Sequence, residues 1–508
     1  MMCNKSPIIK SIQRFKFFVL NELKCQLFGE SSRNELQLTG DICDIKESGI
    51  HDLISKTDDL ILIRVRNLKN IMYQLEDCEF LQLKKMIITE CDEVEYLVDT
   101  SENRIPDSPF LELRSLHLSM LSNLIEVWNG TSRSLCFRWF LNLREIKIRF
   151  CHKLKYVFPL SIGRGLIRLR SIEILDCSEM EGIFYRNEVD DNTNGIYLVE
   201  ELYLYSLPKF VGFLVQRDCT IEEDRVDTNQ SSTTIQIVSN GNGGCNNDEL
   251  MCPARKLQQS VIQQFVPNKQ VSGIKEKDKL SRMEMHSAFA PELMNERLIK
   301  LKKLKVAFCD ALRVIFCFEE NHSTSIGVLN SLEELELYAL RNLKHIWFNI
   351  PQNIIAFRRL RLLVLSECHN SYLLTISMAK LLVQLQKIQI SRCEKMEEII
   401  AAEDAKDVDN TVFPRLKALE LHHMPSLKIF SSVIHAMEFP SLDFLKVNQC
   451  NMMEVFSYGS LDTPMLNKVQ IDGSSYSLMG DVNATLIRYT NTQESTNRWK
   501  LIFAYARS

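Results

Sequence analysis

The feature that most constrains the fold of this chain is a spacing of apolar residues that recurs along its length. Each copy has an apolar residue, two other residues, an apolar residue, one other residue, an apolar residue, two others, and then a cysteine or another apolar residue. Clear copies begin at Leu83, Leu113, Leu143, Leu169, Leu301, Leu332, Leu360, Leu385, Leu416 and Leu442, a looser one at Val199, and weaker ones at Leu60 and Leu466. So many copies predict a stack of similar structural units.

The period of the pattern predicts the type of unit. Successive copies begin 23 to 31 residues apart, except for one step of 102 residues between Val199 and Leu301. This period is close to that of leucine-rich repeats, about 20–29 residues. The two central apolar residues of a copy alternate with others, so they point to one face of a short strand. We therefore predict an α/β leucine-rich-repeat solenoid, with a curved parallel sheet on the concave face and an irregular convex face with short helices.

Two further features, each present in about half of the copies, predict which residues form the core. Seven copies have cysteine at the last position: Cys91, Cys151, Cys177, Cys309, Cys368, Cys393 and Cys450. Six copies have phenylalanine three residues before the first position: Phe80, Phe110, Phe140, Phe357, Phe413 and Phe439. A metal or redox role for the cysteines is the alternative, but their constant place in the repeat predicts a ladder of buried thiols. We also expect short convex helices at Ser161–Arg168 and Ile376–Leu385.

The single large step predicts the organisation of the chain. It holds one ordinary repeat and about 70 extra residues, which fall in a polar stretch rich in Asn, Ser and Gly. We predict a lead-in or partial repeats over 1–56, a first arm of repeats over 57–215, and a polar insertion or flexible linker over 216–291. A second arm of repeats follows over 292–475, and a C-terminal tail over 476–508. A regulatory segment is the other interpretation of the insertion.

Composition excludes several classes of protein. The 61 Lys and Arg and 65 Asp and Glu residues give a formal charge of −4, which argues against nucleic-acid or polybasic membrane binding. The 45% hydrophobic content argues against global disorder. We find no apolar stretch long enough to span a bilayer and no signal peptide. The expectation is a cytoplasmic protein, with a nuclear or membrane-peripheral location left open.

The register of the repeats identifies the solvent-facing residues of the predicted sheet. Exposed aromatic side chains on a rigid sheet are typical anchors of protein interfaces, and mixed charges around them favour selectivity for a protein partner. The candidate protein-binding residues are Tyr203, Tyr205, Lys303, Lys305, Glu334, Glu336, Tyr338, Lys387, His422, Phe444 and Lys446. The same register places Ala307 on this face.

Pairs of neighbouring residues that resemble nucleophile–base pairs are weak candidates for catalysis. They are Cys151–His152, Cys368–His369 and His422–His423. Adjacent residues of a strand point to opposite faces and are poorly placed to share a proton. We therefore expect no catalytic, cofactor-binding or metal-binding residue.

Two stretches are the most distinctive of the chain: residues 413–427, with the sequence FPRLKALELHHMPSL, and 388–403, where a cysteine turn leads into an acidic loop. They resemble the irregular leucine-rich repeats of plant intracellular disease-resistance proteins of the coiled-coil nucleotide-binding class. Residues 177–184 repeat that turn, and 52–98 resemble the first repeats of the class. The resemblance covers about residues 11–475 without the polar insertion.

This resemblance implies a recognition function in plant immunity. The partner would be a pathogen effector or a host protein that it modifies and, in a complete receptor, the nucleotide-binding domain. The chain contains no G-x-x-x-x-G-K-[ST] phosphate-binding loop, so it resembles the recognition half of such a receptor. The main alternative is the substrate-binding leucine-rich-repeat subunit of a ubiquitin ligase. A secreted or membrane receptor ectodomain is disfavoured by the missing signal sequence.

Overall fold

The computed structural model describes residues 16–19, 25–27, 34–47, 51–75, 80, 82–99, 110–129, 139–163, 165–186, 199–216, 286–289, 299–318, 326–351, 354–402, 412–453 and 455–489. The chain divides into two compact units, one of Met1–Arg217 with Met283–Ser508 and one of Asp218–Arg282. Every described residue belongs to the first unit.

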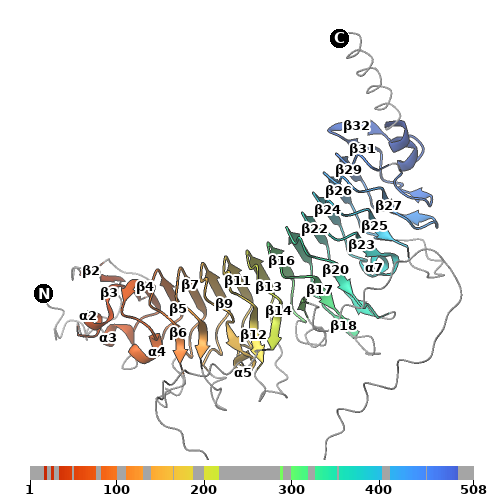
Figure 1. Ribbon diagram of the computed structural model, residues 1–508. Helices are drawn as coiled ribbons and strands as arrows, with labels where there is room; N and C mark the ends of the chain where they lie inside the picture. Colours follow the sequence, from red (N-terminus) through yellow and green to blue (C-terminus); the bar gives the residue numbers. More distant parts are fainter. Residues whose placement is uncertain are drawn as a thin grey trace, which may run out of the picture. The chain divides into compact units, whose positions relative to one another are not determined.

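One long sheet organises this unit, and almost every repeat contributes one strand to it (Figure 1). In spatial order its parallel strands are β1 (Lys16–Val19), β3 (Glu35–Asp41), β4 (Asp59–Arg66), β5 (Lys85–Thr89), β7 (Ser115–Ser119), β9 (Glu145–Arg149), β11 (Ser171–Leu175), β13 (Glu201–Tyr205), β16 (Lys303–Ala307), β19 (Glu334–Tyr338), β22 (Leu362–Ser366), β24 (Lys387–Ser391), β26 (Ala418–His422), β29 (Phe444–Asn448) and β31 (Lys468–Ile471). β2 (Cys25–Leu27) and β32 (Ser474–Ser477) pair antiparallel with β1 and β31 at the two ends.

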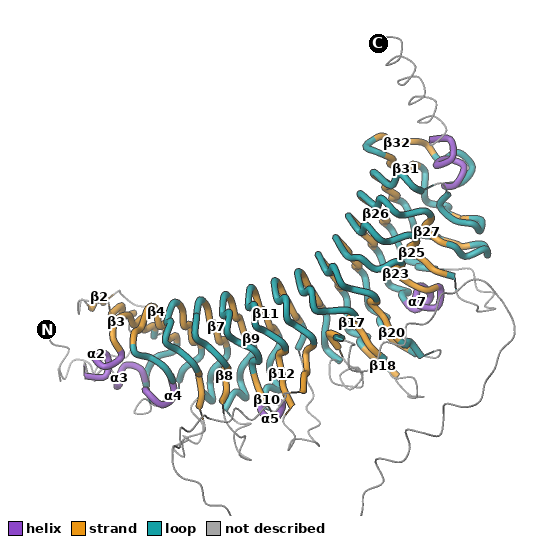
Figure 2. The backbone as a smooth tube through the Cα atoms, in the orientation of Figure 1, coloured by secondary structure: helices purple, strands orange, loops and turns teal. Residues whose placement is uncertain are grey.

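A second row of short strands lies on the other side of the repeats (Figure 2). These strands form small parallel sheets: β6 (Tyr96–Asp99) with β8 (Glu126–Asn129); β10 (Phe158–Pro159), β12 (Gly182–Arg186) and β14 (Gly212–Gln216); β15 (Ser287–Phe289), β17 (Val314–Cys317) and β20 (His345–Phe348); β18 (Ile326–Val328) with β21 (Ile355–Ala356); β23 (Tyr372–Thr375), β25 (Glu398–Ala401) and β27 (Ile429–Ser431); and β28 (Met437–Glu438) with β30 (Leu461–Asp462). The core lies between the long sheet and this row. The predicted leucine-rich-repeat solenoid is therefore confirmed.

The helices within the described ranges are short. They are α2 (Ile42–Glu47), α3 (His51–Ile54), α4 (Ile71–Gln74), α5 (Leu160–Gly163), α7 (Ile376–Leu381) and a helical segment at 482–489. The two helices expected at Ser161–Arg168 and Ile376–Leu385 both exist, but α5 ends five residues early and α7 four. The chain must reach the next sheet strand at Ser171 and Lys387, which leaves little length for a helix.

The alternation of apolar residues along the long sheet behaves as the register predicts. In β19, Leu335 and Leu337 are fully buried, whereas Glu334, Glu336 and Tyr338 are half-buried on the other face. Parallel pairing places each inward leucine beside its equivalent in the next repeat, so the apolar residues merge into one core cluster. A single repeat could not bury this face alone, which is why the fold requires the stack.

The sheet is continuous between the two groups of repeats. β13 pairs directly with β16 over five residue pairs, from Glu201↔Lys303 to Tyr205↔Ala307. The step of 102 residues along the sequence is therefore a single step along the sheet. No other strand of the described residues stands between them.

The register of the first weak copy corrects the sequence analysis. Leu60 pairs with Met86 and Leu62 with Ile88, so the copy begins at Thr57 and not at Leu60. Thr57 is fully buried and its hydroxyl donates to the Leu53 carbonyl at 2.6 Å. A hydrogen-bonded polar residue thus occupies a position that is apolar in the other copies. For this reason the apolar pattern did not reveal the first position of this copy.

A spine of stacked phenylalanines runs through the core. Consecutive rings are 5.2 to 6.3 Å apart in the series Phe80, Phe110, Phe140, Phe158, Phe184, Phe213, Phe289, Phe316 and Phe357. The expected packing of Phe80, Phe110, Phe140 and Phe357 is confirmed. From Phe158 to Phe316, however, the rings come from the second row of strands. Tertiary packing decides which residue supplies the ring, because a phenylalanine three residues before a repeat and one on a second-row strand can both reach the same layer of the core.

The cysteine ladder is structural. Each of the seven cysteines is buried, and its thiol donates to the carbonyl two residues earlier, at 3.4 to 3.6 Å. Burial raises the pKa of the Cys91 thiol to about 11 and that of Cys309 to about 12. These two thiols are therefore held protonated as donors, which makes Cys91 and Cys309 poor nucleophiles and metal ligands.

The turn at the end of each sheet strand has a common backbone conformation. The residue before the cysteine or leucine of the turn has a positive φ in successive repeats, for example 53° at Met120, 56° at Phe150 and 54° at Phe308. Its N–H donates to the strand-end carbonyl of the next repeat, as from Met120 to Arg149 at 2.9 Å and from Phe308 to Tyr338 at 3.0 Å. These bonds extend the sheet ladder into the turns.

Candidate functional site

The solvent-facing residues of the long sheet form three parallel rows that run across the strands. In one part of the sheet, a row contains Glu201, Lys303 and Glu334, the next contains Tyr203, Lys305 and Glu336, and the third contains Tyr205, Ala307 and Tyr338. Neighbouring strands are about 4.8 Å apart, so side chains in one row can interact directly. This part of the sheet, from β13 to β19, brings together seven of the eleven candidate residues, and we call it the tyrosine–lysine face.

The charges of the tyrosine–lysine face are paired with one another. Lys303 Nζ lies 3.3 Å from a carboxylate oxygen of Glu334, and Lys305 Nζ lies 2.9 Å from Glu336. The hydrogen bond to Glu336, assisted by its charge, raises the pKa of Lys305 against the effect of partial burial. The mixed charges of these residues were expected to favour selectivity for a protein partner, which stays a prediction. The structure shows that the charges on neighbouring strands neutralise each other, because oppositely charged residues occupy the same row.

The tyrosines lie around Lys305. The Tyr338 hydroxyl donates to Glu336 at 2.6 Å, and Lys305 Nζ lies over the Tyr338 ring, 5.5 Å from its centroid. Burial raises the pKa of Tyr203 to about 12, and that of Tyr338 is raised by burial and by the bond to Glu336. Ala307, expected on the open face, is only 2% exposed, since it lies between Tyr205 and Tyr338 in the same row. The tyrosines therefore form a half-buried aromatic surface around Lys305.

The remaining four candidates form a second group on β24, β26 and β29. Lys387 Nζ lies 2.7 Å from one carboxylate oxygen of Glu420, and His422 Nε2 lies 3.3 Å from the other. Phe444 and Lys446 follow on the next strand, paired with Ala418 and Glu420. Glu420 joins this group although it was absent from the candidate set. Its position in the repeat, opposite Lys446 and diagonal to Lys387, was the available signal.

Strand β22 separates the two groups. Its outward positions are Leu362, Val364 and Ser366, and Val364 is 8% exposed between Glu336 and Gln389. The candidates therefore form two surfaces on either side of an apolar strand and not one continuous patch. No residue of β22 was among the candidates, although the spacing of Leu360, Leu363 and Leu365 already predicted which of its residues face outward.

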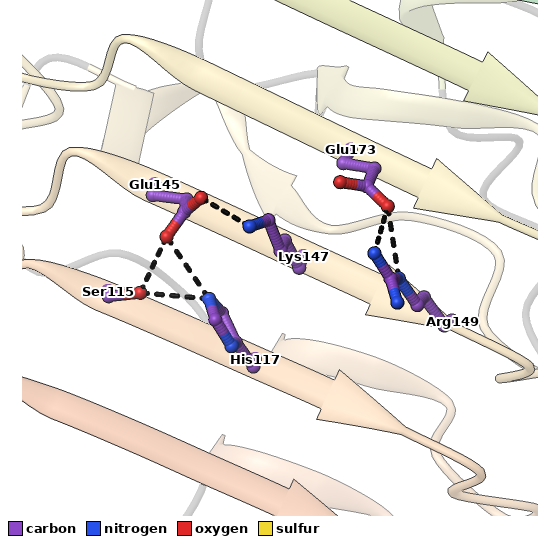
Figure 3. Close-up of polar contacts among 6 residues, drawn as sticks. All are labelled: Ser115, His117, Glu145, Lys147, Arg149 and Glu173. Atoms are coloured by element: carbon purple, nitrogen blue, oxygen red, sulfur yellow. Dashed lines mark hydrogen bonds and ion pairs between the residues drawn. The ribbon is translucent and has the colours of Figure 1, made fainter. Parts of the chain in front are cut away.

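A third polar cluster lies on the same face near the N-terminal repeats (Figure 3). Glu145 accepts a hydrogen bond from Ser115 at 2.9 Å, lies 3.1 Å from His117 Nε2, and pairs with Lys147 at 2.6 Å. At the other end of the same strand, Arg149 makes two hydrogen bonds to Glu173 of the next strand, β11, at 3.0 and 2.5 Å. None of these residues was a candidate.

The Glu145 cluster predicts a dependence of stability on pH. Burial raises the pKa of Glu145, but bonds from Lys147, His117 and Ser115 outweigh it and lower that pKa from 4.5 to about 2. A carboxyl with a depressed pKa stabilises the fold above its ordinary pKa, and this stabilisation is lost as pH falls from about 4.5 towards 2. Glu145→Gln should therefore reduce the decrease in unfolding free energy between pH 6 and pH 3 by about 1 kcal/mol after solvent screening.

Urea unfolding of the two proteins at a series of pH values measures this difference. The matched control is Glu394→Gln, at an exposed glutamate outside the cluster. If the unfolding free energy of Glu145→Gln depended on pH in the same way as that of the wild type, the cluster would contribute nothing to the loss of stability in acid.

The residue pairs considered for catalysis do not form catalytic geometry. Cys151 and Cys368 are buried with their thiols bonded to backbone carbonyls, whereas His152 is exposed. His422 lies on the sheet face and His423 begins the turn, with φ 53°. In the described part of the chain, no group of three or more His, Cys, Asp or Glu side chains is placed to hold a metal ion.

A polar groove lies at the turn end of the C-terminal strands and is separate from both candidate groups. It has a volume of about 1220 Å³, and its lining includes Glu367, Arg392, His423, Asn448 and Asp472. None of the eleven candidate residues lines it. Across the described ranges, no helix is long and apolar enough to cross a membrane.

These repeats match a known family of proteins. The family described as plant disease resistance protein RPS2-like, leucine-rich repeats, matches residues 32–178, 254–394 and 385–471, which is more than half of the chain. No curated protein matches. Among solved structures, the plant peptide hormone receptor RGFR1 in complex with RGF2 is 11% identical over 88% of this chain and 83% of that chain, with a TM-score of 0.16.

Proposed function

Because the chain belongs to the RPS2-like leucine-rich repeats of plant disease resistance proteins, we propose that it is a non-catalytic protein-recognition solenoid that acts in defence. Its partner would be a pathogen effector or a host protein that such an effector modifies. In a complete receptor, the nucleotide-binding domain would be a further partner. Solenoids of this kind serve as extended binding surfaces because each repeat adds one strand to a rigid sheet.

The observation that supports this function best is the tyrosine–lysine face. Tyr205, Lys305 and Tyr338 lie on consecutive strands of a rigid sheet. The cross-strand ion pair between Lys305 and Glu336 and the bond from Tyr338 to Glu336 on its own strand hold two of these side chains before any partner arrives. Rigid aromatic side chains contribute contact area at a low entropy cost and are common anchors in protein interfaces. Since the charges are already paired, a partner would gain mostly from aromatic contact and from the pattern of charges.

A charge-swapped variant tests this proposal with the fold preserved. The changes Glu201→Lys, Lys303→Glu, Lys305→Glu, Glu334→Lys and Glu336→Lys reverse every charge of the face while keeping both cross-strand pairs. We expect the variant to unfold at the wild-type temperature and to lose capture of the partner by about tenfold or more, because the partner meets the opposite pattern. The measurement is affinity for a partner first identified by two-hybrid screening against effectors and host proteins.

The control changes the same types of residue elsewhere. Lys209→Glu, Lys395→Glu and Tyr458→Ala alter exposed side chains outside the long sheet and should leave capture unchanged. Adding Tyr338→Ala to the swapped face should weaken capture further. Partner capture by the folded, swapped variant at wild-type affinity would exclude the tyrosine–lysine face as the binding surface.

A further inference from the structure

The edge at which the strands of the long sheet begin carries a row of basic residues. The residue that follows the first apolar position of each repeat lies on this edge, and its N–H donates to the carbonyl of the equivalent residue in the preceding repeat. The bonds run from Arg114 to Lys84, Arg144 to Arg114, Arg170 to Arg144, Glu200 to Arg170 and Lys302 to Glu200, at 2.7 to 2.8 Å. We call Lys84, Arg114, Arg144, Arg170 and Lys302 the basic edge row. Glu200 is the one acidic residue between Lys84 and Lys302, and Asp58 and Glu333 occupy the same position just beyond the two ends of the row.

The fold does not require basic side chains at this position. Its structural role belongs to the backbone N–H and C=O, and the same position holds Glu333, Gln386 and Asp443 in later repeats. The arginines at 114, 144 and 170 are exposed and occupy consecutive repeats, about 4.8 Å apart. Like charges at that spacing repel one another, so the row reduces the stability of the isolated chain slightly and creates a local positive potential.

The acidic side chains nearby neutralise only part of this charge. Lys84 pairs with Asp58 at 2.5 Å, Arg114 with Glu112 at 3.7 Å, and Glu200 is shared between Lys302 at 2.8 Å and Arg170 at 3.9 Å. In the part of the chain that the structure describes, Arg144 has no carboxylate within 4.0 Å. Arg168 and Lys300, two residues before Arg170 and Lys302, are exposed and add further positive charge.

The opposite ends of the same strands have the opposite character. Their turns carry Glu90, Asp92, Glu93, Asp176, Glu179 and Asp310, against Lys153 and Lys209. The sheet is thus polarised across its width, although the whole chain has a formal charge of −4. Such an arrangement orients an approaching charged partner and favours its contact with one edge.

We propose that the basic edge row binds an extended acidic polypeptide segment that runs across the starts of the strands. Guanidinium groups bind carboxylates through paired hydrogen bonds, which suits the three consecutive arginines. From Lys84 to Lys302 the row spans five strand steps, or about 24 Å, which about seven residues of extended chain cover. A polypeptide can place a neutral or basic residue opposite Glu200, whereas a nucleic acid would set phosphates against that carboxylate.

The probe for this surface is a labelled peptide of ten glutamates with two glycines between the sixth and the seventh, so that a neutral residue can lie opposite Glu200. The edge variant is Arg114→Gln, Arg144→Gln and Arg170→Gln, and glutamine is compatible with the position because Gln386 occupies it naturally. We expect the whole chain to bind the peptide at low salt, with affinity that falls as salt rises, and the edge variant to bind at least about tenfold more weakly. The matched control, Arg341→Gln, Arg392→Gln and Lys395→Gln, removes the same charge from exposed residues elsewhere and should retain binding within about twofold.

Four outcomes would overturn the proposal. The first is that the wild-type chain does not bind the peptide, and the second is that the folded edge variant binds it as tightly as the wild type. The third is that a DNA duplex binds the wild type at least as tightly as the peptide does and does not bind the edge variant. The fourth is that the chain self-associates through this edge and the peptide does not displace the second copy. The basic edge row and the tyrosine–lysine face share no residue, so peptide binding at the edge does not depend on the proposed function. The charge-swapped face variant should therefore still bind the peptide.

Discussion

Leu335→Asp should unfold the repeats around β19. Leu335 is fully buried and pairs with Leu304 on one side and Leu363 on the other, so a carboxylate there has apolar neighbours and no cation. Burying an unpaired charge or protonating it to avoid the charge costs at least about 4 kcal/mol, which is a large share of the stability of a domain. Since each repeat is stabilised by its neighbours, the loss should spread to adjacent repeats.

Circular dichroism during heating measures this effect. The matched control is Ser366→Asp on the neighbouring strand β22, where the same side chain is added to a half-buried position on the open face. We expect the control to remain within about 1 kcal/mol of the wild type. Equal unfolding temperatures for Leu335→Asp and the wild type would mean that Leu335 is not in the core.

Phe316→Ala should cost about 3–5 kcal/mol of unfolding free energy, because it removes a fully buried ring and leaves a cavity. Phe316 stacks on Phe289 at 5.5 Å and contacts Phe357 at 5.2 Å, so its loss interrupts the phenylalanine spine. The interruption lies next to the place where the sheet passes from β13 to β16. Urea unfolding followed by fluorescence and circular dichroism gives the difference in free energy.

Phe308→Ala is the matched control for the spine. Phe308 is 52% exposed at the turn after β16, so the same change should cost less than about 1 kcal/mol. Similar losses for Phe316→Ala and Phe308→Ala would show that the stacked rings contribute no more than surface contacts. A larger loss at Phe316 establishes the spine as a continuous element of the core.

Sequence periodicity was sufficient to predict most of the residues that face the core. The inward positions of β19 and β22, such as Leu335 and Leu363, follow from spacing alone, because a strand turns alternate residues to opposite sides. The prediction was wrong at Leu60, where buried Thr57 broke the apolar pattern, and incomplete at β22, whose outward residues were passed over. It also overestimated the helices that begin at 161 and 376, because periodicity does not reveal how early the chain must turn towards the next strand.

The candidate site was predicted residue by residue but not as a set. Register identified Lys305, Glu336 and Tyr338 as outward-facing, yet nothing in the local sequence shows that Lys305 and Glu336 pair at 2.9 Å. The same holds for Glu420, which links Lys387 and His422. Whether these residues bind a partner stays a prediction.

The sequence by itself determined the type of fold, the face of each strand that is buried and the structural role of the cysteines, because these depend on the spacing of residues within one repeat. Only the tertiary structure decided which charges neutralise each other, where the phenylalanine spine changes rows and how the sheet continues from β13 to β16. These features depend on contacts between repeats. Glu200 and Lys302 are 102 residues apart in the chain, yet their side chains form an ion pair at 2.8 Å because their strands are neighbours.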